Sequence, residues 1–152
     1  MDKRAEFNAA LKDAMKNKDA VALSTLRLIM AALKDRDISA RAVGKTEGVE
    51  DAEVLSMLST MIKQRQESQK TYSDAGREDL ASREAEEIDV IQRFMPKQLS
   101  DAELEAVVAE LITKTGATGV KDMGKVMNAL KADYDWQADI GRAGAVVKAK
   151  LA

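Results

Sequence analysis

The sequence contains neither cysteine nor histidine. Without cysteine the chain has no thiol nucleophile, no disulfide framework and no thiolate ligand for a metal. Without histidine it has no imidazole general base, no Ser-His-Asp relay and no common nitrogen ligand for zinc. Because these absences exclude most familiar hydrolytic and metal-dependent chemistry, we expect no catalytic residue, no bound metal and no cofactor.

Long apolar runs are missing as well. No stretch approaches the roughly 20 apolar residues that a helix needs to cross a bilayer, and the first residues, MDKRAEFNAALKDAM, lack the continuous apolar segment of a signal peptide. The acidic residues Asp2, Glu6 and Asp13 in that segment also argue against a transit peptide. The sequence therefore predicts a cytoplasmic protein that does not associate with membranes.

Charge is nearly balanced over the whole chain but not along it. The formal net charge is -2, which excludes a global basic field that would attract nucleic acid or membrane. Residues 114–152, however, carry 7 Lys+Arg against 4 Asp+Glu. This local positive excess is the one electrostatic indication of an anionic partner.

Apolar residues recur at helical spacing almost throughout, and no sustained alternation indicates strands. The pattern predicts an all-α protein with an N-terminal four-helix bundle over residues 1–95 and a C-terminal three-helix bundle over residues 96–152. The segment RDISARAVGKTEGVED, which interrupts the pattern with two glycines and mixed charge, predicts a mobile loop. The apolar stripes run over residues 7–15, 23–33, 54–65, 80–95, 104–112, 123–130 and 140–151.

The segment QRFMPKQLSDAEL contains the only proline of the chain, Pro96. Proline disfavours helical geometry at the preceding residue, so the helix before it should end one or two residues earlier. Ser100 is placed to cap the next helix, with Glu103 as its capping-box partner and Leu99 and Leu104 as a hydrophobic staple. These signals favour a structural joint over a kink within one helix.

The glycines of TGATGVKDMGKVM invite comparison with a phosphate-binding loop, but the eight-residue P-loop pattern and its preceding strand are missing. Gly116 is placed to end one helix in a left-handed conformation, and Asp139 to cap the last helix. Gly124 lies inside a helix, where glycine costs about 1 kcal/mol relative to alanine. Its presence predicts close approach of another helix or of an external partner, with packing favoured over ligand contact.

Two other clusters have a plain and a functional interpretation. Glu84 and Glu87 are paired carboxylates, but without histidine a solvated helix face with Arg77, Arg83 and Arg93 as ion-pair partners is favoured over a metal site. Tyr134 and Trp136 are available for base stacking. Because Asp133, Asp135 and Asp139 surround these aromatics and would repel phosphate, a packed Trp and a solvated face are favoured.

The segments FMPKQLSDAELEAVV and TGATGVKDMGKVMNALK together carry a resemblance. The chain resembles the YqeY-like proteins, which share their two helical modules with the C-terminal part of the B subunit of glutamine-dependent tRNA amidotransferases. The likeness covers nearly the whole chain, and its most specific parts are F-x-P-K-Q-L-S and K-D-M-G-K-V-M-x-A-L-K. It implies a four-helix bundle followed by a three-helix bundle.

In the amidotransferase, the tail module helps to hold the tRNA while other domains perform the amidation. The resemblance therefore implies a tRNA-binding or accessory protein with no activity of its own. A family-level description as a carbon-nitrogen ligase with glutamine as amide donor would then refer to the larger enzyme. Family members often carry a basic Gly-Arg-Ala-Asp stretch after the sixth helix, whereas here ADYDWQAD intervenes. We therefore expect RNA contact mainly at Lys121, Lys125 and Lys131, with Arg142 and Lys148 as further candidates.

Two other functions stay open. A protein-protein adaptor without RNA binding is favoured by the near-neutral charge and by Met123 and Met127, since methionine suits adaptable apolar surfaces. An enzyme with a carboxylate or lysine at its centre is disfavoured because histidine and cysteine are missing.

Overall fold

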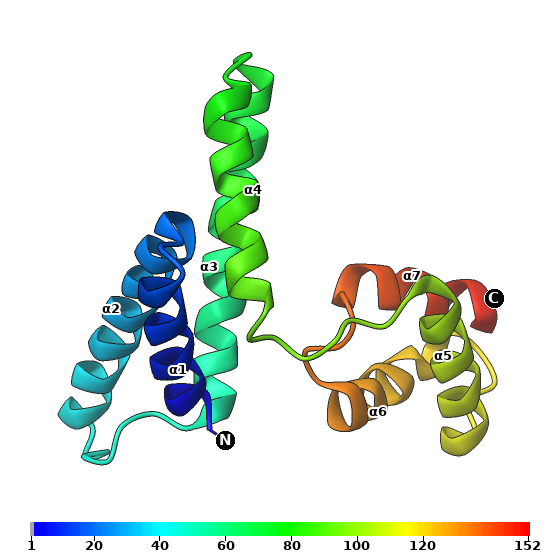
Figure 1. Ribbon diagram of the computed structural model, residues 1–152. Helices are drawn as coiled ribbons and strands as arrows, with labels where there is room; N and C mark the ends of the chain where they lie inside the picture. Colours follow the sequence, from blue (N-terminus) through cyan, green and yellow to red (C-terminus); the bar gives the residue numbers. More distant parts are fainter. Residues whose placement is uncertain (1) are drawn as a thin grey trace. The chain divides into compact units, whose positions relative to one another are not determined.

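The computed structural model describes residues 2–152, and over this range it contains seven α-helices, one short 3-10 helix and no strand (Figure 1). The all-α prediction is confirmed. None of the helices in the described range is long and apolar enough to cross a membrane. The helices are α1 (Lys3–Lys16), α2 (Ala20–Ala42), α3 (Asp51–Asp74), α4 (Glu78–Gln92), α5 (Asp101–Thr115), α6 (Met123–Tyr134) and α7 (Ile140–Leu151), with the 3-10 helix η1 (Val120–Asp122) before α6.

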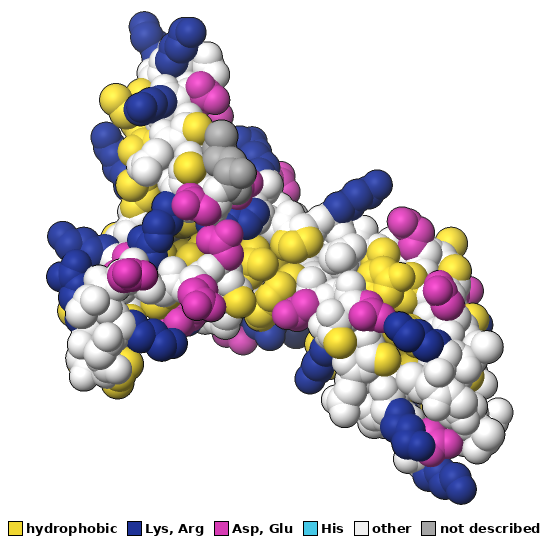
Figure 2. Space-filling model, turned by 90° about the horizontal axis from the view of Figure 1, so that it is seen from below, with side chains coloured by type: hydrophobic (Ala, Val, Ile, Leu, Met, Phe, Trp, Pro, Cys, Tyr) yellow, Lys and Arg dark blue, Asp and Glu magenta, His cyan; other side chains and the backbone are white. Residues whose placement is uncertain are grey.

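The chain forms two compact units, Met1–Met95 and Pro96–Ala152. We call them the N-terminal and C-terminal units. Each has its own cluster of buried apolar side chains. On the face seen in Figure 2, acidic and basic side chains are interspersed. That each unit folds as a separate domain stays a prediction.

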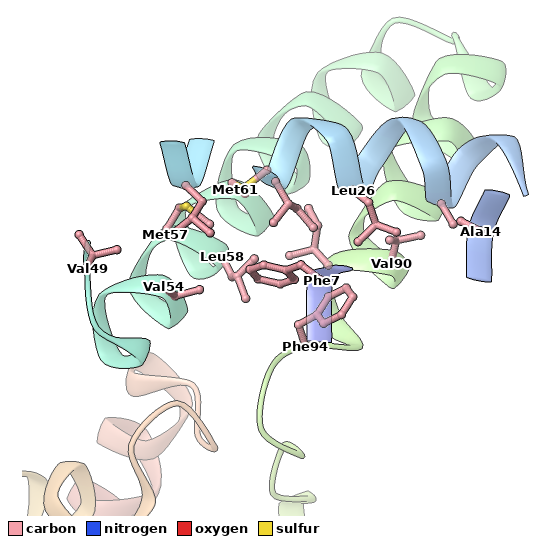
Figure 3. Close-up of a cluster of buried hydrophobic side chains, with 14 of the residues drawn as sticks. Phe7, Ala14, Leu26, Val49, Val54, Met57, Leu58, Met61, Val90 and Phe94 are labelled. Carbon is pink, nitrogen blue, oxygen red and sulfur yellow. The ribbon is translucent and has the colours of Figure 1, made fainter. Parts of the chain in front are cut away.

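In the N-terminal unit, α1 packs on α2, and α2 and α3 pack on α4. Phe7 of α1 lies at the centre of the core, with its ring 4.9 Å from that of Phe94 in an edge-to-face arrangement. Figure 3 shows these two rings beside each other, with Leu58 of α3 next to Phe7. Aromatic pairs of this geometry contribute about 0.5–1.5 kcal/mol beyond the burial of their area, so Phe94 ties the end of the unit to its first helix.

Helices α3 and α4 form a hairpin that runs beyond the ends of α1 and α2 (Figure 1). An ion pair between Arg65 Nε and Glu87 Oε2, 3.0 Å apart and mostly shielded from solvent, joins the two helices. Burial, and next the nearby charge of Glu87, raise the pKa of Glu84. The expected ion pair with Arg83 is confirmed for Glu87, but the expected solvated face is wrong for this residue, because its side chain is mostly buried against Arg65 of α3.

The expected mobile loop over RDISARAVGKTEGVED is also wrong in its extent. Helix α2 continues through the first half of this segment to Ala42, and only residues 43–50 connect α2 to α3. Val49 in this connection is buried in the core of the N-terminal unit. The glycines and mixed charges did not indicate the longer helix or the buried Val49, because the hydrogen bonds that order the segment involve residues far away in the sequence.

Asp37 of α2 organises this connection. The Asp37 carboxylate accepts two hydrogen bonds from the Arg4 guanidinium of α1, at 2.7 and 2.8 Å, and one from the Val49 backbone N–H at 2.9 Å. Arg4 also donates to the Val49 carbonyl oxygen at 3.1 Å. We call this network the Arg4–Asp37 clip. It joins α1, α2 and the connection that leads into α3, and the hydrogen bonds from Arg4 and Val49 lower the pKa of Asp37 from 3.8 to about 2.

In the C-terminal unit the predicted caps are confirmed. The Ser100 hydroxyl accepts from the Glu103 N–H and the Glu103 carboxylate accepts from the Ser100 N–H, which completes the capping box of α5. Gly116 ends α5 with a φ of 70°, and Asp139 accepts from the Arg142 N–H at the start of α7. Local chemistry is enough to specify such caps because both partners lie within three residues of each other.

The residues after Pro96 are held by a contact that local patterns do not reveal. The Gln98 side-chain amide donates to the Trp136 carbonyl at 2.5 Å, and the Leu99 N–H donates to the Gln137 carbonyl at 2.8 Å. Trp136 has a φ of 66°, a left-handed conformation that costs a non-glycine residue about 1–2 kcal/mol. These two hydrogen bonds hold the strained turn between α6 and α7 against the start of the unit.

Replacing Asp37 with Asn should lower the free energy of unfolding at pH 7 by roughly 2 kcal/mol, since charge-assisted hydrogen bonds to Arg4 are lost. The folded-state pKa lies below the ordinary value, so the stabilisation is complete above about pH 4 and disappears as the pH falls through about 2. Urea unfolding followed by circular dichroism should show that the difference in free energy of unfolding between wild type and Asp37→Asn decreases as the pH falls from about 4 to about 2. Asp35→Asn, at an exposed position nearby, should change the free energy of unfolding only slightly.

Gly48 and Gly44 form a matched pair for testing the clip. Both have a left-handed backbone, with φ of 91° and 89°. A Cβ at Gly48 would lie 2.7 Å from Arg4 Nη2 and 3.0 Å from Asp37 Oδ1, whereas a Cβ at Gly44 would meet nothing within 4 Å. We expect Gly44→Ala to cost about 1 kcal/mol from backbone strain and Gly48→Ala at least about 1 kcal/mol more. If chemical denaturation showed equal losses of unfolding free energy for the two variants, the proposed contribution of the clip to stability would be contradicted.

Candidate nucleic-acid interface

The five predicted RNA-binding side chains all lie at the surface of the C-terminal unit. Lys121 belongs to η1, Lys125 and Lys131 to α6, and Arg142 and Lys148 to α7. Residues six apart on a helix point roughly 120° away from each other. Lys131 therefore does not share a helix face with Lys125, nor Lys148 with Arg142. Lys121 and Lys125 lie on either side of the junction between η1 and α6, and both act on the charge of Asp122.

Asp122 fixes the turn that carries this pair. Its carboxylate accepts hydrogen bonds from the Thr118 backbone N–H at 3.0 Å and from the Thr118 hydroxyl at 3.3 Å. The first of these bonds is the main cause that lowers the pKa of Asp122. The ionised carboxylate also lies 3.9 Å from Lys125 Nζ. Asp122 thus orders the turn, and its charge offsets part of the positive charge beside it.

Arg142 has a partner inside the unit. Its guanidinium forms an ion pair with the Asp101 carboxylate at the start of α5, which joins the first turns of α5 and α7. Lys114 pairs in a similar way with Asp133, at 3.3 Å. The positive excess of residues 114–152 is therefore divided between side chains in ion pairs and side chains directed at solvent. On the face seen in Figure 2, positive and negative side chains of the C-terminal unit alternate accordingly.

The two aromatics of the predicted stacking site differ in role. Tyr134, at the end of α6, is half-buried and packs against the apolar core of the unit. Trp136 is half-buried in the strained turn, where its carbonyl accepts the hydrogen bond from Gln98. The favoured interpretation was a packed Trp, but the aromatic side chain that packs on the core of the unit is that of Tyr134. Trp136 instead contributes its backbone carbonyl, a role that the sequence pattern did not indicate.

A model of the family described as YqeY-like protein matches residues 4–151. The chain belongs to the YqeY-like protein family. Three curated relatives, each named Altered inheritance of mitochondria protein 41, mitochondrial, are 27–29% identical to this YqeY-like protein. The relative from Lachancea thermotolerans is 28% identical and aligns with 91% of this chain and 75% of its own. Those from Vanderwaltozyma polyspora and Pyrenophora tritici-repentis are 27% and 29% identical, with 84% and 82% of this chain and 70% and 69% of their own covered.

These relatives correct one prediction. All three are named as mitochondrial proteins, which contradicts the cytoplasmic location that we expected for this YqeY-like protein. The error lies in the inference from composition. The apolar content of a chain decides whether its helices can span a bilayer, and it does not identify a compartment.

Within the family motif K-D-M-G-K, Gly124 corrects another prediction. The expected close approach of a neighbouring helix is wrong, because a Cβ built on Gly124 would meet nothing within 4 Å among residues 2–152. The residue stands exposed on the first turn of α6, between Lys121 and Lys125 in the sequence. Of the explanations considered for this glycine, contact with an external partner is the one compatible with the open space.

Gly124→Ala tests whether any packing inside the chain requires the glycine. Alanine in a helix is favoured over glycine by about 0.5–1 kcal/mol, and the new methyl group has room. We therefore expect the variant to be as stable as the wild type or more stable by up to about 1 kcal/mol, measured by urea denaturation. Gly144→Ala is a second helical variant for comparison, because its Cβ would make an ordinary van der Waals contact with Met123 Cε at 3.5 Å. A destabilised Gly124→Ala protein would show that the glycine has a packing role.

Proposed function

We propose that this YqeY-like protein is a non-catalytic tRNA-binding or accessory protein whose C-terminal unit makes the RNA contact. The observation that carries the proposal is the exposed K-D-M-G-K turn, in which Lys121, Gly124 and Lys125 make no contribution to the buried core. The resemblance to the tail of the tRNA amidotransferase B subunit supports tRNA as the ligand. Glycine at this place allows a sugar-phosphate backbone to approach α6 closely while the two lysines reach neighbouring phosphates.

The charges limit this interaction to a weak one. The chain as a whole carries a net charge of -2, and Asp122 lies beside Lys125. Only a few phosphates can therefore be neutralised, and affinity should fall with salt with a slope of about 0.7–0.9 per phosphate contact. Arg142 is a secondary contact in this proposal because it must exchange or share its partner Asp101, and Lys131 and Lys148 extend the basic surface to other faces.

The proposal includes no reaction. In the amidotransferases that the chain resembles, other domains perform the amide transfer, so a carbon-nitrogen ligase label describes the larger enzyme. For the fold, we propose that α1–α4 act as one four-helix bundle and α5–α7 as one three-helix bundle, as the separate buried clusters suggest.

We expect the purified protein to bind unfractionated tRNA at low ionic strength and to lose affinity steeply as salt is added. Lys121→Glu combined with Lys125→Glu should weaken binding about tenfold or more, because two attractive contacts become repulsive. The matched control is Lys12→Glu combined with Lys16→Glu, which makes the same charge change at exposed positions of α1. Fluorescence anisotropy with labelled tRNA over a salt series measures all three proteins.

Two outcomes would contradict the proposal. One is the absence of tRNA binding at low salt, and the other is an equal loss of affinity in the α1 control, which would indicate a general charge effect. Gly124→Ala adds a test that is independent of charge. If the backbone of the RNA approaches α6 at this position, the variant should bind tRNA more weakly while remaining fully folded.

A further inference from the structure

Helix α2 has an outer face that is exposed among the described residues 2–95 of the N-terminal unit. Its inner face supplies Leu26, Ile29 and Leu33 to the core. On the opposite side, Leu28 and Ile38 are 47% and 52% exposed. Both are among the most exposed large apolar residues of the described chain.

The residues of this outer face follow a heptad pattern. The positions 28, 31, 35, 38 and 42 are separated alternately by three and four residues, as the a and d positions of a coiled coil are. They are occupied by Leu28, Ala31, Asp35, Ile38 and Ala42, all of which are exposed. We call this set the α2 seam. It is about 21 Å long at 1.5 Å per residue, which suits a partner helix of about four turns.

A row of cations flanks the seam. Arg27, Lys34 and Arg41 are spaced by seven residues and occupy the position that precedes each a residue. None of the three takes part in an ion pair within the range 2–152. In a coiled coil this position faces charged residues of the partner and sets its choice.

The cationic side of the seam borders a hollow of about 500 Å³ between α2 and the start of α1. Apolar and basic residues share its lining, and they include Leu33, Lys34, Ile38 and Arg41. At its floor, the Arg4–Asp37 clip is already satisfied by its own hydrogen bonds. A side chain entering from a partner would therefore meet apolar walls and the unpaired cations Lys34 and Arg41.

From this arrangement we propose that the α2 seam binds an acidic amphipathic helix of another protein. The partner helix presents apolar residues to Leu28 and Ile38, and glutamate or aspartate to Arg27, Lys34 and Arg41. Asp35 lies in the middle of the seam, where a buried carboxylate requires a cation. One lysine or arginine of the partner helix faces Asp35 and specifies the register, as single polar residues do in coiled-coil seams.

Other occupants fit this face less well. A second copy packed in parallel would bring two Asp35 carboxylates into one layer, and an antiparallel copy would bring the two rows of cations together. In a complex with RNA, the exposed Leu28 and Ile38 would make no favourable contact with the phosphate backbone, and Asp35 would repel it. A membrane surface would have to accept the Asp35 carboxylate at the centre of the inserted face.

The test uses a synthetic helix as the probe. A fluorescein-labelled 21-residue peptide carries leucine at its a and d positions, glutamate at its e and g positions, and one lysine at the central a position. We expect it to bind the full chain with micromolar affinity, since the contact is shorter than a standard interface. A second peptide with lysine in place of every glutamate should bind at least about tenfold more weakly.

Variants of the full chain locate the contact. Arg27→Glu, Lys34→Glu and Arg41→Glu together should weaken peptide binding about tenfold or more, and Ile38→Ser should weaken it without any change of charge. The matched control is Lys12→Glu, Lys16→Glu and Lys70→Glu, three exposed cations of the same unit but outside the seam, which should leave affinity within about twofold. Circular dichroism verifies that each variant is folded.

The proposal is overturned if the acidic peptide does not bind, if the basic peptide binds equally well, or if the control variant loses as much affinity as the seam variant. Sedimentation velocity of the free chain tests the competing occupant. A dimer that Ile38→Ser dissociates would assign the seam to a second copy instead. Because the tRNA experiment uses variants of the C-terminal unit, either result stands without the other.

Discussion

The Arg4–Asp37 clip constrains more of the N-terminal unit than any other polar contact. A carboxylate that is largely removed from water must be paired or hydrogen-bonded, and Asp37 meets this need with the Arg4 guanidinium and the Val49 N–H. The same network holds the first turn of α1 against α2, keeps Val49 buried and leaves room only for glycine at position 48. Because α2 is held by its inner side in this way, its outer face stays free.

The C-terminal unit shows how the two segments that carry the resemblance, F-x-P-K-Q-L-S and K-D-M-G-K, divide into architectural and exposed residues. Gln98, Ser100 and Asp122 all make hydrogen bonds inside the unit, to the α6–α7 turn, to the cap of α5 and to Thr118. Lys121, Gly124 and Lys125 stand on the exposed side of the same ordered turn. A rigid support beneath exposed cations lowers the entropy that binding would cost, which is why the turn is a better candidate interface than the scattered lysines of α7.

The two candidate surfaces have different physical characters. The α6 turn offers charge and close backbone approach with little apolar area, which suits a polyanion. The α2 seam combines exposed Leu28 and Ile38 with a spaced row of cations, which suits an amphipathic helix. The adaptor function considered from the sequence placed its contact on Met123 and Met127, but these residues pack against the core of their own unit. An adaptor role is therefore better placed on α2.

Apolar periodicity was sufficient to predict an all-α chain, and local chemistry was sufficient for the capping box at Ser100, the left-handed Gly116 and the cap at Asp139. Each of these features depends on residues within a turn or two of one another, so both interacting partners can be recognised in one short stretch of sequence. The Arg4–Asp37 pair spans 33 positions and the Gln98–Trp136 bond spans 38, and neither can be found without the fold. The same holds for the open space at Gly124 and the uncovered face of α2. Whether a surface is covered depends on which distant helices pack against it, and that is decided only when the core closes.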